Sequence, residues 1–297
     1  MTIAIALKVG DGVVLGADSA ATLSGAGGIA NVYFNAEKIS NLVKGLPLGM
    51  ATFGLGGLDG RSVTALAKDL RQRLTTGDAN WRLDPGSYTM SDVATRVRRF
   101  FYDEYYLKEF PKKVKDAKGA EIARWERMGF FVAGFSSGAA HAEVWTIEID
   151  DKGQCPQPKV ALDSSQSGNA TWAGAPEALN RLFRGWSGQV YSGLNASGIP
   201  EKAVEQFLTS LPMEPLIQAA MPLQDAIDLV KYMVDVTVGF VRFIPGPPTV
   251  AEPCDIAAIT KHEGFRWVRR KHYYSREFNP LTSNREQPHS PSAPNAS

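Results

Sequence analysis

The order of strand-like and helix-like segments in this 297-residue sequence predicts an α+β fold, a four-layer αββα sandwich in which helices cover the outer faces of two packed β-sheets. Two observations lead to this class. Strand patterns come in groups, each followed by helical patterns, instead of alternating regularly with helices as in a doubly wound sheet. The composition is 44% hydrophobic, which is enough to fill a sizeable core in a chain of this length.

The chain opens with a predicted β-hairpin. Residues 2–8 and 12–17 are apolar and β-branched, and Gly10-Asp11-Gly12 between them is a strong turn signal. Residues 22–28 are small and flexible, so we expect a loop there. Two further strands are predicted at 38–43 and 48–53 before any helix.

Helical patterns follow this first group of strands. Apolar residues recur at helical spacing between Arg61 and Thr75, and Ser91 is expected to cap a second helix that ends by Pro111. The second half of the chain repeats the order of strands, helices and strands. We expect strands at 129–135, 141–149, 159–162 and 170–173, helices at 176–183, 200–211 and 223–243, and a closing hairpin at 255–260 and 265–269.

These segments predict a single domain over residues 1–274. The remaining residues, 275–297, are rich in Ser, Pro and Asn. Such a composition buries too little apolar surface to fold, so we expect a mobile tail.

The charge balance argues against polyanionic partners. The formal net charge is +1, from 32 basic and 31 acidic side chains, so neither nucleic acid nor an anionic membrane surface is expected as a partner. Basic runs such as Arg269-Arg270-Lys271 are interpreted as a solvated face. No stretch approaches the ~20 apolar residues of a membrane span, and no signal-peptide pattern opens the sequence, so a cytoplasmic location is predicted.

The cysteines and histidines indicate no metal site. Cys155 and Cys254 are far apart in the sequence, with no second pair, and are interpreted as free thiols in a reducing cytosol. Neither cysteine has metal-ligand spacing to the histidines, so no structural metal is expected. No cofactor is expected either.

The second residue carries candidate chemistry. If Met1 is removed, Thr2 becomes the N-terminal residue and holds both a hydroxyl nucleophile and a free amine that can act as its base. A free α-amine has a pKa of roughly 8, close enough to neutral to accept the hydroxyl proton. Threonine is also common after an initiator methionine, so this position alone does not identify an enzyme.

Several stretches together resemble a known family. Thr2 follows a lone methionine, a strand pair ends in Gly12-Val13-Val14-Leu15-Gly16-Ala17-Asp18-Ser19-Ala20-Ala21-Thr22, Glu37-Lys38-Ile39 comes next, and a glycine-rich strand end precedes a helix. With the closing strands at 255–268, these stretches resemble the proteasome β-subunit type of N-terminal nucleophile (Ntn) hydrolase, as a bacterial proteasome-like member. The segments near 77–90 and 111–128 exceed what the resemblance implies and are interpreted as insertions.

The resemblance implies a catalytic role for three residues. Thr2 corresponds to the nucleophile, Lys38 to the catalytic lysine, and Asp18 to the carboxylate that holds this lysine. A nearby ammonium group on Lys38 would lower the pKa of the Thr2 amine through like-charge repulsion. The alternative is a plain structural ion pair between Asp18 and Lys38.

The resemblance also implies an oxyanion donor, a specificity pocket and an assembly. The backbone amide of Gly54, or alternatively of Gly56, corresponds to the oxyanion donor, and Ala20 and Ala21 border the expected substrate pocket. The implied function is a threonine-type peptidase that acts on a peptide or protein substrate within a homo-oligomeric ring or related assembly.

Two departures leave a non-enzymatic alternative open. The family has a serine at the position that reads Ala175 here. Its second supporting Asp and Ser are expected near the end of the 223–243 helix, where this chain reads Val241-Arg242-Phe243-Ile244. The chain is therefore alternatively a catalytically silent assembly subunit.

A third hypothesis is a serine esterase. Gly134-Phe135-Ser136-Ser137-Gly138 matches the nucleophile-elbow pattern, with Ser136 as nucleophile, Asp255 as acid and His262 or His272 as base. That motif requires a strand, a sharp turn and a helix. Strand alternation follows it here, which favours a hairpin turn.

Overall fold

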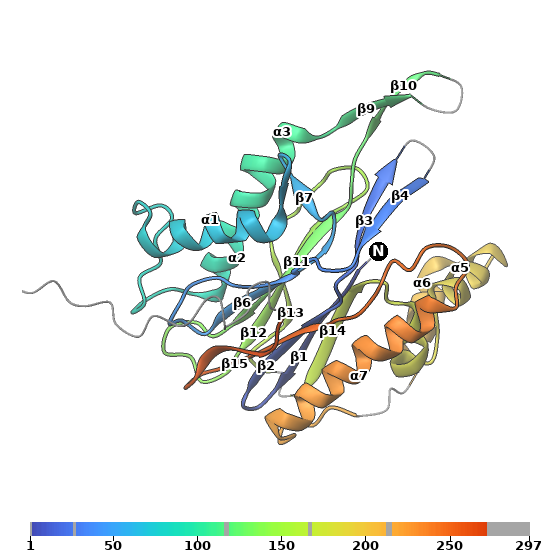
Figure 1. Cartoon of the computed structure of the whole chain (residues 1–297). Helices are drawn as coiled ribbons and strands as arrows, with labels where there is room; N and C mark the ends of the chain where they lie inside the picture. The colour runs from blue at the N-terminus through green and yellow to red at the C-terminus, as the bar shows by residue number, and fades with distance from the viewer. Residues whose placement is uncertain (1, 26–27, 116–118, 166–167, 212–215, 272–297) are drawn as a thin grey trace, which may run out of the picture.

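The computed structural model describes residues 2–25, 28–115, 119–165, 168–211 and 216–271. The predicted tail at 275–297, Met1 and His272 lie outside these residues. The described chain forms a mixed α/β fold with several sheets, which confirms the predicted combination of sheets and helices (Figure 1).

The first five-stranded sheet is built around the N-terminal hairpin. Its strand order is β14–β1–β2–β15–β16, and each neighbouring pair is antiparallel. The turn at Gly10-Asp11 joins β1 to β2, as predicted, in a register that pairs Val9 with Gly12. The strands are β1 (Ile3–Val9), β2 (Gly12–Ala17), β14 (Asn169–Gly174), β15 (Asp255–Thr260) and β16 (Gly264–Arg269).

The second five-stranded sheet has the order β13–β12–β11–β6–β5 and is also antiparallel. The predicted hairpin at 129–149 forms its centre, since β11 pairs with β12 along its whole length. The strands are β5 (Ile39–Asn41), β6 (Leu48–Gly54), β11 (Met128–Gly134), β12 (Glu143–Ile149) and β13 (Lys159–Leu162).

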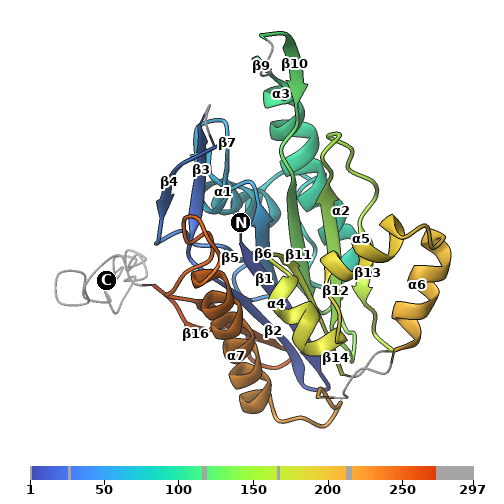
Figure 2. The same cartoon turned by 90° about the vertical axis from the view of Figure 1, so that its right-hand side faces the viewer.

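Three apolar clusters hold these elements together. One joins small residues of the first sheet, such as Ala4 and Ala6, to Phe131 of the second. Another joins the second sheet to α1 (Val63–Thr76) and α2 (Met90–Arg98), and a third joins the first sheet to α4 (Glu177–Leu179) and α7 (Leu223–Arg242). Figures 1 and 2 show α7 on the opposite side of the strands from α1 and α2. Every residue of β1 is buried because both faces of the strand are covered.

A glycine in β2 lets α7 approach the first sheet closely. A Cβ atom at Gly16 would lie 2.3 Å from Cγ1 of Val230, far inside van der Waals contact. The glycine therefore sets the distance between this helix and the strand that ends at Asp18.

The second helix starts one residue before the predicted cap. Ser91 lies inside α2, and Thr89 is the N-cap: its side chain accepts a hydrogen bond from the Asp92 N–H, while the Asp92 carboxylate accepts one from the Thr89 N–H. This reciprocal capping box satisfies two otherwise unpaired donors, which explains why the N-cap of α2 is Thr89 and not Ser91. The remaining helical segments are η1, a π-helical stretch (Arg99–Tyr106), α3 (Leu107–Glu109), η2, also π-helical (Asn180–Arg184), α5 (Gly188–Ala196) and α6 (Glu201–Ser210).

The loop predicted at 22–28 is wrong. Strands β3 (Ala21–Gly25) and β4 (Gly28–Tyr33) pair antiparallel there, and the many glycines and other small residues at 22–28 gave only a weak strand signal. Of the predicted insertions, the one near 111–128 contains the hairpin of β9 (Lys112–Lys115) and β10 (Glu121–Arg124), whereas the one near 77–90 buries Trp81, Leu83 and Tyr88 in the core. A short pair, β7 (Gly57–Leu58) and β8 (Arg61–Ser62), precedes α1.

No helix within the described ranges is both long and apolar enough to cross a membrane.

The burial of the two cysteines predicts that they resist alkylation in the folded protein. Both thiols are free and buried, and burial raises the pKa of Cys155 to about 11 and also raises that of Cys254. At pH 8 only about one Cys155 side chain in a thousand would be a thiolate, the reactive form. Iodoacetamide labelling at pH 8, followed by mass spectrometry, should modify neither cysteine until urea unfolds the chain. Rapid labelling of the folded protein would contradict this.

Candidate active site

The antiparallel pairing of β1 with β2 brings Thr2 and Asp18 to the same end of these two strands. Thr2 directly precedes β1, which lies between β14 and β2, and the register pairs Ala4 with Ala17. Thr2 is 4% exposed and Asp18 is completely buried. Thr2 is therefore almost completely covered by the surrounding atoms.

Asp18 accepts hydrogen bonds on both carboxylate oxygens. Its Oδ1 atom accepts from the Ile3 N–H at 3.0 Å and from Nζ of Lys38 at 2.6 Å. Its Oδ2 atom accepts from the N–H groups of Ala20, at 2.9 Å, and Ala251, at 3.2 Å. One carboxylate thus connects the start of β1, the end of β2, the segment before β15 and the lysine.

Lys38 is a buried cation held by Asp18. It precedes β5, and its side chain is 7% exposed. Burial lowers the pKa of Lys38, the Asp18 carboxylate opposes this effect, and the nearby Lys271 ammonium adds to it. The structure therefore brings together the predicted Asp18 and Lys38. Asp18 also bonds the N–H of Ile3, the residue that follows Thr2.

A second buried ion pair lies beside the first, and sequence reasoning missed it. Nζ of Lys271 lies 2.8 Å from Oδ2 of Asp255, with side-chain exposures of 7% and 0%. The same Nζ donates to Oγ of Ser19 at 2.7 Å and to the carbonyl of Ala36 at 2.6 Å. The interpretation of Arg269-Arg270-Lys271 as a solvated face is wrong for Lys271. The pairing of β15 with β16 places Lys271 next to Asp255, and the pairing of β15 with β2 brings this pair beside Ser19.

Gly174 fixes the backbone beside Thr2. It ends β14 opposite Ile3, and its φ of +101° lies in a region that favours glycine. A Cβ atom at this position would lie 1.8 Å from the carbonyl oxygen of Thr2. Only glycine allows β14 to pass this close to the candidate nucleophile.

The predicted oxyanion donors lie at the end of β6. The Thr52 N–H donates to the Lys38 carbonyl at 2.9 Å, which places this end of β6 next to Lys38. Gly54 ends the strand with a φ of +82°. The following N–H, of Leu55, already donates to the Arg127 carbonyl at 2.9 Å. For Gly56, no acceptor of the N–H is found in the described part of the chain.

The residues predicted to border the substrate pocket differ in exposure. Ala20 is fully buried, and its N–H is bonded to Asp18, whereas Ala21 is half-buried at the start of β3. Of the two, only Ala21 is partly exposed.

The two departures noted in the sequence have structural counterparts. Ala175 is buried in the apolar cluster between the first sheet and α7, where it offers no hydrogen-bonding group. At the end of α7, Val241 packs into the same cluster and Phe243 is 82% exposed. Neither position supplies a hydroxyl or carboxylate group to Thr2.

The esterase residues do not form a triad. Oγ of Ser136 accepts the Met90 N–H at 2.9 Å, at the start of α2, and Asp255 is paired with Lys271. Asp255 begins β15, whereas His262 follows its other end, about 17 Å away at the usual rise per residue. His272 lies outside the described residues.

Comparison with known proteins relates the fold to that of solved structures. The sequence matches no family model and no curated protein. Among solved structures, Anbu (ancestral beta-subunit) from Yersinia bercovieri has a TM-score of 0.50 and 13% sequence identity, over 91% of this chain and 88% of that one. A Gly-1 mutant of Anbu from Hyphomicrobium sp. strain MC1 has a TM-score of 0.49 and 17% identity, over 91% and 86%.

These findings define a proteasome-like fold similar to that of Anbu. They also correct the identification made from the sequence. The chain was identified there as resembling the Ntn hydrolase family of proteasome β subunits, but no family model matches, and identity this low shows the fold alone. Membership of that hydrolase family does not follow.

Replacing Asp18 by Asn should destabilise the protein strongly. The change keeps the shape of the side chain but leaves Lys38 buried without a counter-charge, which costs about 3–5 kcal/mol of unfolding free energy. The matched control is Asp69→Asn, which breaks the exposed pair with Arg61 and should leave the unfolding free energy nearly unchanged. Urea titration measures both. Equal effects of the two substitutions would contradict a structural dependence on Asp18.

Replacing Gly174 by Ala should displace Thr2. The new methyl group overlaps the Thr2 carbonyl and strains the backbone, at a cost of about 2 kcal/mol or more. Gly193→Ala is the control, because Gly193 lies in α5 with open space around it and alanine favours a helix. Thermal unfolding should show a lower Tm for Gly174→Ala and an unchanged or higher Tm for Gly193→Ala.

Proposed function

We propose that this chain is an amide-bond hydrolase of the threonine type, with Thr2 as the nucleophile after Met1 has been removed. One observation carries the proposal. Oδ1 of Asp18 accepts both the Ile3 N–H and the Lys38 ammonium group, so a buried cation is held next to the residue that follows Thr2. Met1 itself lies outside the described residues.

In the proposed reaction, the free amine of Thr2 takes the proton from the hydroxyl group of the same residue, and the oxygen attacks the carbonyl carbon of a peptide. The tetrahedral oxyanion is held by a backbone N–H, that of Gly54 or alternatively that of Gly56. The amine then passes the proton to the leaving nitrogen, and an ester remains on Thr2. Water hydrolyses this ester and restores the hydroxyl group.

Lys38 and Asp18 have separate roles in this proposal. The ammonium group of Lys38 lowers the pKa of the Thr2 amine, which keeps more of it in the basic form at neutral pH. Asp18 orients Lys38 and offsets the cost of burying its charge. Ala20 and Ala21 border the proposed substrate pocket, of which Ala21 contributes the exposed surface.

The proposal extends to organisation and context. We propose one domain over residues 1–274, organised as a four-layer αββα sandwich, which the three apolar clusters between sheets and helices support. We further propose a homo-oligomeric ring or related assembly, supported by the similarity of the fold to that of Anbu, an ancestral beta-subunit. A cytoplasmic setting is supported by the two free, buried cysteines.

The second candidate is a catalytically silent assembly subunit. Ala175 and the end of α7 favour it, because neither supplies the hydroxyl or carboxylate groups that would support Thr2 and Lys38. In that case Asp18 and Lys38 form only a structural pair.

Mass spectrometry and covalent labelling distinguish these candidates. For an active enzyme, the intact mass should lack Met1, and a peptide epoxyketone should modify Thr2. The Thr2→Ala variant should not be labelled, whereas Thr2→Ser, which keeps the hydroxyl group, should be. Retention of Met1, or its loss without labelling of Thr2, would favour the silent subunit. Labelling of Ser136 by a fluorophosphonate would instead support the esterase.

A further inference from the structure

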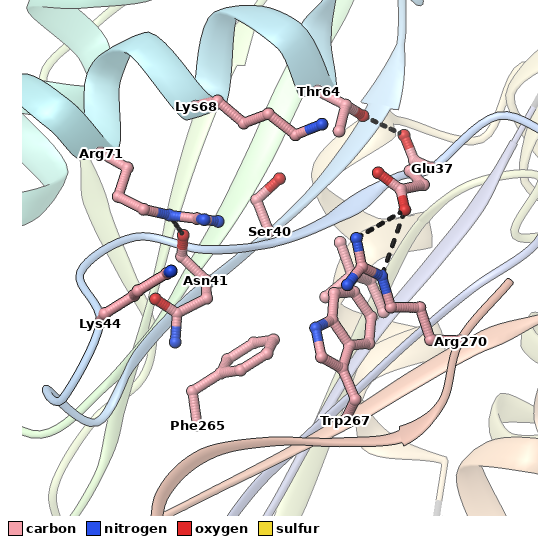
Figure 3. A pocket seen from close by; sticks show the side chains of 11 residues that line it. Glu37, Ser40, Asn41, Lys44, Thr64, Lys68, Arg71, Phe265, Trp267 and Arg270 are labelled. Carbon is pink, nitrogen blue, oxygen red and sulfur yellow. Dashed lines mark hydrogen bonds and ion pairs between the residues drawn. The ribbon is translucent and has the colours of Figure 1, made fainter. Parts of the chain in front are cut away.

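A pocket of about 230 Å³ is lined by residues on both sides of Lys38 in the sequence (Figure 3). It is formed by α1, by the segment that contains β5, and by β16. Thr2, Asp18 and Lys38 do not line it. The lining residues are Glu37, Ile39, Ser40, Asn41, Lys44, Thr64, Lys68, Arg71, Phe265, Trp267 and Arg270.

The pocket has an excess of positive charge. Its one carboxylate, Glu37, is 4% exposed and already bonded to Arg270, at 3.1 and 3.3 Å. Within the described residues, no ion pair involves Lys44, Lys68 or Arg71. Burial, and repulsion by Arg270, lower the pKa of Arg71, and the Glu37 carboxylate partly opposes them. Beyond the pair of Glu37 and Arg270, the three cations Lys44, Lys68 and Arg71 leave the pocket with surplus positive charge, which is the electrostatic setting of an anion site.

Polar and aromatic groups complete the lining. Oδ1 of Asn41 is buried and has no hydrogen-bond partner in the described part of the chain, so it calls for a donor. Figure 3 shows the Ser40 hydroxyl group directed toward the space between Lys68 and Glu37. Phe265 and Trp267 line the opposite wall, with ring centroids 5.2 Å apart.

We propose that this pocket binds a small phosphomonoester that carries hydroxyl groups, of the size of a sugar phosphate. A phosphate dianion matches the surplus charge of Lys44, Lys68 and Arg71 better than one carboxylate does. A hydroxyl group of the sugar can hydrogen-bond with Ser40, and the C–H face of the sugar can pack against Phe265 and Trp267. The volume is below the range of about 300–1,000 Å³ that is typical for larger ligands, so the ligand is small.

This site is independent of the proposed hydrolase activity. The pocket is next to the proposed active site in the sequence, because its lining residues Glu37 and Ile39 flank Lys38. Binding can therefore be measured without any turnover of a peptide.

Calorimetric titration of the full chain with ribose 5-phosphate tests the proposal. We expect saturable binding with a Kd between about 10 μM and 1 mM. Ribose, which lacks the phosphate, inorganic phosphate, which lacks the sugar, and gluconate, which carries one carboxylate, should each bind at least about tenfold more weakly. Absence of saturable binding, or equal binding of any of these three compounds, would overturn the proposal.

Two variants locate the binding site. Arg71→Gln and Lys68→Gln should each weaken binding about tenfold or more, because each removes a charged contact to the phosphate. Arg71 also donates to the Asn41 carbonyl at 2.7 Å, so its variant can disturb the fold. Lys68→Gln is therefore decisive, since Lys68 is exposed on α1. Lys202→Gln, at an exposed position of α6, is the charge-matched control and should bind like the unmodified chain. Unchanged binding by Lys68→Gln would rule out this pocket.

Discussion

The buried carboxylate of Asp18 is the interaction on which the candidate site depends. Removing a charge from water is costly, and Asp18 recovers this cost through three backbone N–H groups and the Lys38 ammonium group. Three of its four partners, Ile3, Lys38 and Ala251, come from distant parts of the chain. The same contacts that offset the burial of the charge therefore also fix where β1 begins, next to Thr2.

The second ion pair, between Asp255 and Lys271, extends this arrangement. It reaches the first pair through Ser19, which accepts from Lys271 and donates to the carbonyl of Pro253. Lys271 also holds the carbonyl of Ala36, two residues before Lys38. Charged side chains thus gather next to an otherwise apolar region between the sheets, and each charge has a partner. The two pairs are coupled at Lys38, because the Lys271 ammonium group lowers the pKa of Lys38 and the Asp255 carboxylate raises it.

The strand patterns and the local turn signals made most of the fold predictable. The Gly10-Asp11 turn, the strands at 159–162 and 255–260, and the long helix near 223–243 follow from local periodicity, and the structure has them at nearly those bounds. The β3–β4 hairpin and α5 were missed because their small residues carry weak propensities, and backbone pairing or packing decided their conformation. At α2, two acceptable caps stood close together, and only the reciprocal bond with Asp92 favoured Thr89.

The sequence by itself pointed to Thr2, Asp18 and Lys38 as candidate site residues, through the family resemblance of the strands around them. Only the tertiary structure decided that Lys271 is buried beside Asp255, that Ala175 packs in an apolar cluster, and that three unpaired cations share one pocket. These features depend on which strands become neighbours. Contacts between residues far apart in the chain determine which strands pair, and the local periodicity of the sequence does not reveal these contacts.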